Sequence, residues 1–275
     1  MKLFVFNLDY AHERRKFITT QLDKLGLDYE IQKCVIGKNL TQEELEREVH
    51  MGYMAKSPNW FTPGAIGVTI TAKLIYQKII DQNLPYALVI EDDIVLHKNL
   101  PQILIEIEPN IIDGEVILLY YNHTANNSSA RLSTQNPTPL KNNYSLYYPV
   151  SNHEVTMGCA VIITKGAAEG IIRVNTPIVA IADSWDYFYK TGGIKQIRCI
   201  YPTIVYPADF KSTIEYTNLS FKKSNLIPKI LSLVDKYKVF PFFQLLKQRR
   251  KARRKQRESI SLVNQPSIFV SNVKQ

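Results

Sequence analysis

The stretch YALVIEDDIVL, residues 86–96, places three consecutive carboxylates, Glu91, Asp92 and Asp93, between two runs of aliphatic residues. A short continuous apolar run that follows a proline is typical of a strand buried on both faces. Alternate side chains of an extended chain share a face, so Glu91 and Asp93 point one way and Asp92 the other, with the paired Cα atoms roughly 6.6 Å apart. The sequence therefore predicts a buried strand that ends in a charged site.

The three carboxylates suggest a metal site. Glu91 and Asp93 cannot both be buried as bare anions, because desolvated like charges repel each other. A divalent cation with oxygen ligands, Mg²⁺ or Mn²⁺, resolves this conflict, and such ions typically bridge protein carboxylates and substrate phosphates. The alternative is an exposed turn in which one aspartate caps the next helix, and the triplet alone does not decide between the two.

Predicted strands and helices alternate along the chain. Apolar runs predict strands near residues 3–8, 29–35, 115–121 and 156–164, and helical spacing covers residues 13–26 and 66–80 and a segment from Gly166. Thr41 and Glu44 predict a capping box. The alternation indicates an α/β sheet, in which ligands gather at the carboxyl ends of the strands. Residues 122–143 are polar and rich in turn formers, which predicts a long surface loop or lid.

A change of composition predicts two parts in the chain of 275 residues: a catalytic domain over 1–220 and a C-terminal helical segment over 221–275. Residues 226–239 have amphipathic helical spacing, and the last fifteen or so residues are expected to be mobile. The net charge is +9, and eight positive charges lie within residues 247–257: Lys247, Arg249, Arg250, Lys251, Arg253, Arg254, Lys255 and Arg257. This run favours a peripheral anchor on anionic lipid. Nucleic-acid binding is the alternative, but no recognisable nucleic-acid module accompanies the run, so no nucleic acid is expected.

The cysteines and the start of the chain indicate a cytoplasmic protein. Cys34, Cys159 and Cys199 are far apart, odd in number and in no metal-ligand spacing, which predicts three reduced thiols. Acidic residues from Asp9 onward come too early for a signal-peptide core, and no apolar run approaches 18 residues. We therefore expect a protein peripheral to the inner face of the cytoplasmic membrane.

Several segments, in this order, resemble glycosyltransferase family 25, the bacterial lipooligosaccharide galactosyltransferases. They are MKLFVFNLDYAHERRKFI (1–18), TPGAIGVTITAKLIYQKII (62–80), YALVIEDDIVL (86–96), MGCAVIITKGAAEGII (157–172), PIVAIADSWD (177–186) and KSTIE (211–215). The resemblance covers about residues 1–220. It implies a GT-A type, Rossmann-like nucleotide-diphospho-sugar transferase fold, a UDP-sugar donor, and an inverting reaction that gives a β linkage.

The resemblance also implies roles for the triplet. Asp93 is the expected direct ligand of Mn²⁺ or Mg²⁺, Glu91 assists it, and Asp92 bonds to ribose or to a nearby backbone group. The cation would stabilise the departing UDP as a Lewis acid.

At the start of the chain, Asn7 and Asp9 are expected to face the nucleotide. Arg14 and Arg15 are placed to reach uracil or phosphate, although two adjacent arginines in a helix more often form a solvated face.

An inverting displacement needs a base that takes the proton of the acceptor hydroxyl. Asp183 and Asp186 are the candidates, and they share a side if their segment is helical. Asp186 is slightly favoured as the base, with Asp183 as an acceptor-binding or second metal-shell residue, but the order is open. In the alternative interpretation Asp183 is a helix N-cap and Trp185 belongs to the core.

The chain departs from the family pattern in residues 62–80. Ala65 stands where the family usually has Glu, and Thr71-Ala72 stands where it has Ser-His. Thr71 keeps a hydroxyl and is assigned to the nucleotide site, whereas Ala72 cannot replace an imidazole. Either that histidine is not needed, or the donor preference has changed, or activity has been lost.

The expected function is the transfer of a hexose, galactose first, from a UDP-hexose to a lipooligosaccharide. Two alternatives stay open: a metal-dependent phosphohydrolase that acts on a nucleotide sugar, and an inactive family member that binds glycan or membrane. Galactose or glucose, the acceptor sugar, the linkage position and the oligomeric state also stay open.

Overall fold

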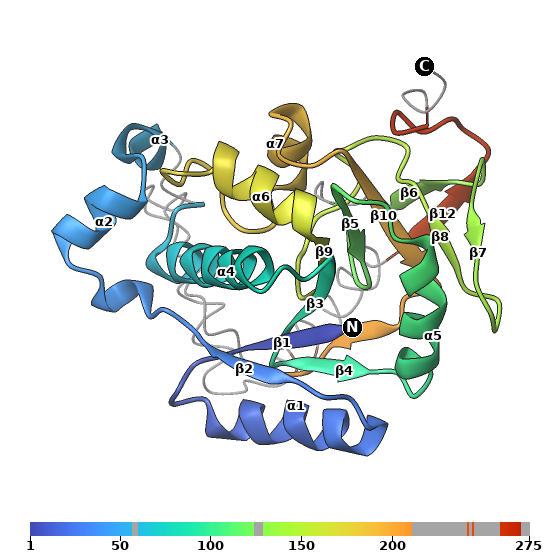
Figure 1. Cartoon of the computed structure of the whole chain (residues 1–275), viewed down its shortest axis with the longest axis horizontal. Helices are drawn as coiled ribbons and strands as arrows, with labels where there is room; N and C mark the ends of the chain where they lie inside the picture. Colours follow the sequence, from blue (N-terminus) through green and yellow to red (C-terminus); the bar gives the residue numbers. More distant parts are fainter. Residues whose placement is uncertain (57–59, 124–128, 211–240, 242–243, 245–258, 271–275) are drawn as a thin grey trace.

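The computed structural model describes residues 1–56, 60–123, 129–210, 241, 244 and 259–270, and within these residues eight strands form one mixed sheet (Figure 1). The strand order is β2 (Glu30–Lys33), β1 (Lys2–Asn7), β3 (Tyr86–Glu91), β9 (Ala160–Thr164), β5 (Glu115–Leu118), β10 (Gln196–Tyr201), β8 (Ser145–Tyr147) and β7 (Thr138–Pro139). Strands β2, β1 and β3 run parallel, as do β5 and β10, whereas β9 is antiparallel to both of its neighbours. The predicted α/β class is confirmed.

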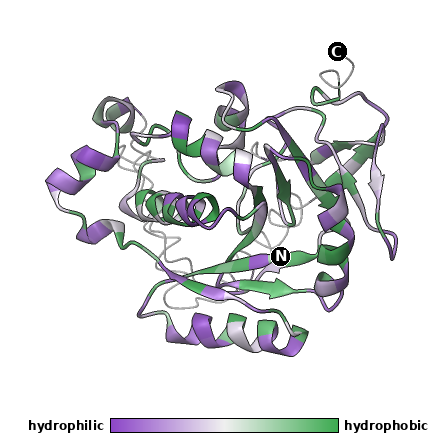
Figure 2. Ribbon diagram, in the orientation of Figure 1, coloured by the Kyte–Doolittle hydropathy of each residue, from purple (hydrophilic) through white to green (hydrophobic). Residues whose placement is uncertain are grey.

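Helices cover both faces of this sheet (Figure 1). One face packs against α4 (Pro63–Asp81), α6 (Lys165–Val174) and α7 (Trp185–Lys190), and the other against α1 (His12–Leu25) and α5 (Leu100–Ile107). Side chains alternate between the two layers, so that Phe4 and Val89 join the first and Leu3 and Leu88 the second. In Figure 2 the central strands are mostly hydrophobic, while hydrophilic residues occupy the outer sides of the helices.

Local signals set several boundaries. Helix α1 ends at Gly26, whose φ of 66° is left-handed and suits glycine. Helix α2 (Gln42–Glu48) begins with the predicted capping box of Thr41 and Glu44. Gly67 lets α4 pack directly on the chain after β2, because a Cβ at Gly67 would lie 2.4 Å from the carbonyl oxygen of Val35. The close contact at Gly67 places the first turns of α4 against the chain that follows β2.

The shorter elements are η1 (Gly37–Asn39), α3 (Met51–Lys56), β4 (Ile94–Leu96), η2 (Glu108–Asn110), β6 (Ala130–Ser133), β11 (Val205–Pro207) and β12 (Ile260–Val263).

The expectations of a surface loop over residues 122–143 and of a mobile C-terminal end are wrong in part. Strand β6 lies within the expected loop of residues 122–143 and pairs in parallel with β12, near the C-terminus. No local signal marks this pairing, because it joins residues that lie about half of the chain apart in sequence.

Other expectations have different outcomes. Among the described residues, no helix is long and apolar enough to cross a bilayer. The three cysteines are free, as predicted, and burial raises the pKa of each thiol, to about 12 for Cys34, where Asp92 and Glu91 add to the rise. The predicted boundary at residue 220, the helix over 226–239 and the basic run lie outside the described residues.

Candidate functional site

The acidic triplet lies at the carboxyl end of β3, in the turn that leads to β4. Glu91 and Asp93 line a cavity of about 290 Å³ between the sheet and α4. Asp92 instead bonds Asn7 and Arg14. This is the alternation that the extended chain predicts, and it separates the triplet into a pair that faces the cavity and one carboxylate held within the protein.

Asp92 is anchored from β1 and α1. Its residue is 5% exposed, and its carboxylate accepts hydrogen bonds from Asn7 Nδ2 at 2.7 Å and from Arg14 at 3.0 Å. Burial raises the pKa of Asp92, while the Asn7 hydrogen bond and the Arg14 charge oppose the rise. Asn7 and Arg14 are the side-chain partners of Asp92 in this structure, and its expected contact with ribose stays a prediction.

Arg14 joins the two aspartates. Its guanidinium also lies 2.9 Å from Asp93 Oδ2, and it stands 5.5 Å from the ring centroid of Phe210. A planar fork that serves two carboxylates in this way fixes their relative position. Arg15 is exposed and lies near Tyr29, which agrees with the solvated-face alternative for this second arginine.

The cavity beside the triplet is acidic at one side and apolar elsewhere. Glu91, Asp93 and Asp183 line it together with apolar side chains from α4 and the sheet. Burial, and then the negative charges of Asp93, Asp183 and Asp92, raise the pKa of Glu91 to about 8. Three carboxyl groups therefore meet at this cavity, and Arg14 pairs with one of them, Asp93.

The two departures from the family pattern fall in the wall of this cavity. Ala65 and Ala72, about two turns apart on α4, both line it, beside Val68 and Tyr76. The missing Glu and His therefore alter the site itself. Thr71 has a different position: it is completely buried, donates to Gly67 O at 2.7 Å and accepts from Val35 N at 2.9 Å. Its hydroxyl is used within the fold and does not face the cavity.

The carboxylates fit a cation that a substrate would help to hold. Among the described residues no group of three His, Cys, Asp or Glu side chains forms a ready-made metal site. However, Mg²⁺ and similar ions are commonly held by one or two carboxylates together with substrate phosphates. Glu91 and Asp93 provide two carboxylates in one cavity, and the raised pKa of Glu91 reflects the repulsion that a cation would relieve.

Asp183 and Asp186 have different surroundings. Helix α7 begins at Trp185, so Asp183 precedes the helix and the two aspartates do not share a helical face. Asp183 lies between two cavities, the one beside the triplet and a second of about 630 Å³. Burial raises its pKa, and backbone groups, with the Thr156 hydroxyl at 3.5 Å, partly oppose this. Of these two cavities, Asp186 lines only the second.

The carboxylate of Asp186 is already engaged by neighbours. Lys190 Nζ donates to it at 2.9 Å, His153 Nδ1 lies 3.3 Å away, and the amide of Asn152 also donates to it. Asp183 has no ion pair with any residue in the described part of the chain. Of the two, Asp183 is therefore the more available base.

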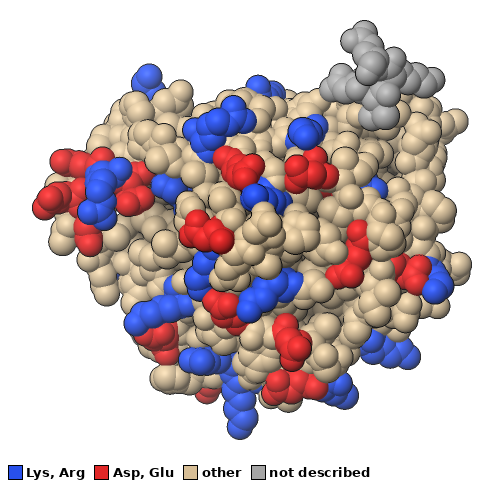
Figure 3. Space-filling view, viewed as in Figure 1, with Lys and Arg blue, Asp and Glu red and all other residues tan. Residues whose placement is uncertain are grey.

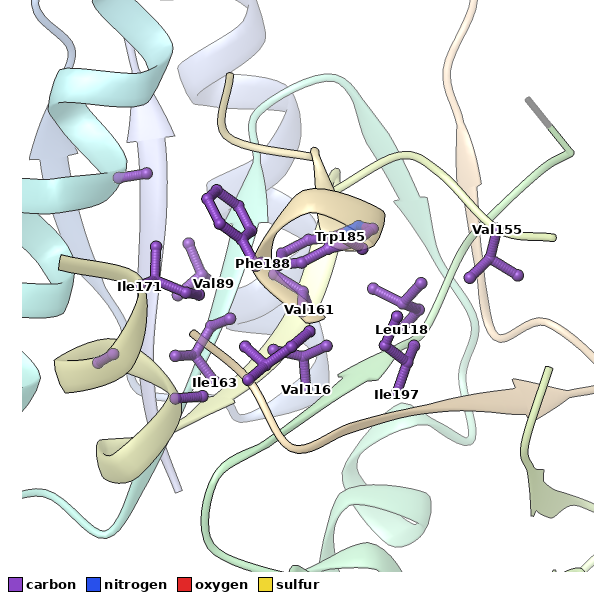
Figure 4. Packing of buried hydrophobic residues seen from close by; sticks show 14 of the residues in the cluster. Val89, Val116, Leu118, Val155, Val161, Ile163, Ile171, Trp185, Phe188 and Ile197 are labelled. Carbon is purple, nitrogen blue, oxygen red and sulfur yellow. The ribbon is translucent and has the colours of Figure 1, made fainter. Parts of the chain in front are cut away.

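Met157 is a site residue that the sequence reasoning missed. Its φ of 83° is left-handed, which is uncommon and strained for a side chain of this size. Its backbone hydrogen-bonds the carboxylate of Asp183, and its carbonyl oxygen accepts the indole N–H of Trp185 at 2.9 Å. Trp185 in turn packs against Phe188 and Val161 in the core, as in the alternative interpretation, although the residue before the helix is Ser184 and not Asp183 (Figure 4). No sequence signal marks such a strained residue, apart from the glycine that follows it.

Asp9 lies away from the triplet. It forms an ion pair with Lys33, and its side chain is 55% exposed. Both residues line a separate cavity of about 550 Å³ at the carboxyl end of β2. The expected contact of Asp9 with a nucleotide stays a prediction, and it concerns this neighbouring hollow.

Carboxylates at the carboxyl ends of parallel strands, beside a cavity, define an α/β protein that binds a ligand at this end of its sheet. The model of the family described as Glycosyltransferase family 25 (LPS biosynthesis protein) matches residues 1–185, about two thirds of the chain. The chain belongs to glycosyltransferase family 25.

Two curated relatives come from animals. A glycosyltransferase 25 family member of Aedes aegypti is 31% identical over 99 residues, which are 34% of this chain and 16% of the relative. Procollagen galactosyltransferase 1-A of Xenopus laevis is 29% identical over 126 residues, which are 43% of this chain and 21% of the relative. The matched region is thus about a fifth or less of either relative. The resemblance also extends beyond bacterial enzymes.

Solved structures resemble the chain only distantly. The chain of A197 from STIV has a TM-score of 0.39 at 10% identity, with 76% of this chain and 94% of that one covered. S. aureus TarS 1-349 has a TM-score of 0.38 at 11% identity, with 75% and 59% covered. Scores this low carry no argument about function.

Proposed function

We propose that the protein is a metal-dependent, inverting glycosyltransferase that moves a hexose from a UDP-sugar to a saccharide hydroxyl of a lipooligosaccharide. Galactose is the first candidate for this hexose. The observation that carries the proposal is the position of Asp183, in the wall shared by the cavity of the acidic triplet and by a second cavity. A transferase needs two substrates that meet at one base, and this arrangement offers a place for each. Family membership supports the same class of reaction.

In this mechanism, side chains at the end of β3 position the cation and the carboxylates around it. Glu91 and Asp93 would hold a Mn²⁺ or Mg²⁺ ion, which would supply Lewis-acid stabilisation of the charge that develops on the leaving diphosphate. Asn7 and Arg14 keep Asp92, and through it the turn, in position. Ala65, Ala72 and the apolar residues beside them exclude water from the sugar.

Asp183 acts as the general base in place of Asp186, the residue that the sequence slightly favoured. The Asp186 carboxylate is occupied by Lys190, whereas Asp183 stands where the two cavities meet. A base works only when it is deprotonated, and burial raises the pKa of Asp183. The rate should therefore fall as the pH drops through a value above that of an ordinary aspartate.

The test is a donor screen. Purified protein is incubated with Mn²⁺ and each common nucleotide sugar, and UDP release is followed for the wild type and for Asp93→Ala, Asp183→Asn and Asp186→Asn. We expect one UDP-hexose to release UDP, no release in Asp93→Ala, and a rate reduced by roughly 10²- to 10⁴-fold in Asp183→Asn. Asp186→Asn is the matched control and should lose less.

Two other outcomes would replace the proposal. Formation of UMP and a hexose phosphate in place of UDP, with no transfer to added saccharide, would identify a phosphohydrolase. No release together with no metal-dependent UDP binding would identify a family member that only binds glycan or membrane, as the change from His to Ala72 would then explain.

We also propose that the basic run of residues 247–257 attaches the enzyme to an anionic membrane surface on the cytoplasmic side. The support is its sequence alone: eight positive charges within eleven residues, after an aromatic-rich stretch.

A further inference from the structure

The second cavity, which Asp183 also lines, has the size of a small-molecule site. Its volume is about 630 Å³, within the range of roughly 300–1,000 Å³ that is usual for small-molecule sites. It shares Ile181, Asp183 and Trp185 with the cavity of the acidic triplet, so the two hollows adjoin at this wall. A ligand in the second cavity would therefore lie next to a ligand in the first.

An exposed tryptophan lines this cavity. Trp60 is 63% exposed, although a tryptophan is normally well buried. Its neighbour Phe61 is only 8% exposed and packs with Val49 and Ile178, and Thr62 caps α4. Trp60 therefore directly precedes a buried anchor and a helix start, while its own indole is exposed. Tyr187 of α7 adds a second, partly exposed aromatic ring to the lining.

The polar groups of the cavity suit an uncharged ligand. The amide oxygen of Asn152 and the hydroxyl of Ser184 add polar atoms to the lining, whereas the Asn152 amide nitrogen and His153 contact Asp186. The negative charge of Asp186 is balanced by Lys190 at 2.9 Å, which leaves Asp183 as the carboxylate without an ion pair among the described lining residues. An aromatic face beside hydrogen-bonding groups matches the apolar C–H surface and the hydroxyls of a pyranose.

We propose that this second cavity is the acceptor subsite, in which a neutral pyranose packs on Trp60. This inference rests on the proposed function. The acceptor hydroxyl oxygen attacks the anomeric carbon of the donor sugar and forms the new C–O bond. The bond from that carbon to the diphosphate oxygen breaks and UDP leaves with the electron pair, while the hydroxyl proton passes to the carboxylate of Asp183. Trp60 positions the acceptor and takes no part in the bond changes.

The test measures saccharide binding without turnover. Saturation-transfer NMR is recorded with the full chain, Mg²⁺ and UDP, and with a panel of methyl α- and β-pyranosides of glucose, galactose, mannose and N-acetylglucosamine. We expect ring protons of at least one pyranoside to receive saturation, with affinity about tenfold weaker in Trp60→Ala and largely kept in Trp60→Phe. The control is Ile105→Ala, which removes a side chain that is 61% exposed on α5 and should leave binding unchanged.

Several results would overturn the proposal. They are no saturation of any pyranoside, equal affinity in Trp60→Ala, or stronger saturation of the pyranoside when UDP is left out of the sample, which would make the cavity a nucleotide site. Failure of the proposed function would give a different result, because UDP release into water needs only the donor. If UDP release persists while no pyranoside binds, the proposed donor reaction is retained and the proposed acceptor subsite is wrong.

Discussion

At the scale of single residues, three adjacent carboxylates have three different environments. Asp92 is buried and bonded to Asn7 and Arg14, Asp93 shares Arg14 but lines the cavity, and Glu91 lines the cavity with a pKa raised to about 8. The pleat of the strand accounts for the opposite directions of Asp92 and of its neighbours. Arg14 pairs with both Asp92, which is held within the protein, and Asp93, which lines the cavity.

Replacing Arg14 should therefore destabilise the fold. Arg14→Met leaves the carboxylate of Asp92, whose side chain is 7% exposed, without its cation, and we expect a loss of roughly 3 kcal/mol in the free energy of unfolding. Urea denaturation followed by tryptophan fluorescence measures this loss. Arg15→Met is the matched control, because Arg15 is exposed, and it should change stability by less than about 0.5 kcal/mol. Equal effects of both substitutions would contradict the role of Arg14.

At the scale of elements, residues 259–270 are part of the folded body. Strand β12 pairs in parallel with β6, and Phe269 is 2% exposed. The Phe269 ring stacks on Tyr148 at 6.3 Å and meets Tyr189 edge-on at 4.6 Å. Residues 259–270 thus close the side of the sheet near β8 and α7, and the expectation of a mobile end is wrong for them.

Phe269→Ala should be costly. Loss of a buried phenylalanine usually reduces the free energy of unfolding by roughly 3–5 kcal/mol, through lost burial and the cavity that remains. Ile268→Ala is the adjacent control at a side chain that is 37% exposed, and it should cost about 1 kcal/mol or less. Thermal and urea unfolding of both variants provide the measurement. If Phe269→Ala were no worse than its neighbour, the segment would not be docked as described.

At the scale of the whole molecule, charge is distributed unevenly along the chain. On the face in Figure 3, acidic and basic side chains are interspersed with no large region of one sign. The excess of nine positive charges is nearly matched by the eight in residues 247–257. Because β11 precedes this run and β12 follows it, the run connects two parts of the folded body and is not a terminal tail.

This connection decides how membrane binding should be tested. Truncation would also remove β12 and Phe269, so the eight basic residues of the run are instead replaced by glutamine. We expect the wild type to float with anionic vesicles and the variant to remain unbound, since each charge near such a surface contributes roughly 1 kcal/mol. Neutralising exposed Arg15, Lys16 and Lys24 of α1 is the control and should leave flotation intact. Flotation of the glutamine variant with the wild type would exclude the basic run as the anchor.

The sequence by itself determined the α/β class, the capping box of α2, and the direction of each carboxylate in the triplet. These properties depend on period, on local hydrogen bonds and on the pleat of one strand, all of which act over a few residues. Tertiary structure decided the pairing of β6 with β12, the strained backbone of Met157 beside Asp183, and the different surroundings of Asp183 and Asp186. Each of these arises from contacts between segments far apart in the chain, where long-range packing and charge compensation outweigh local preference.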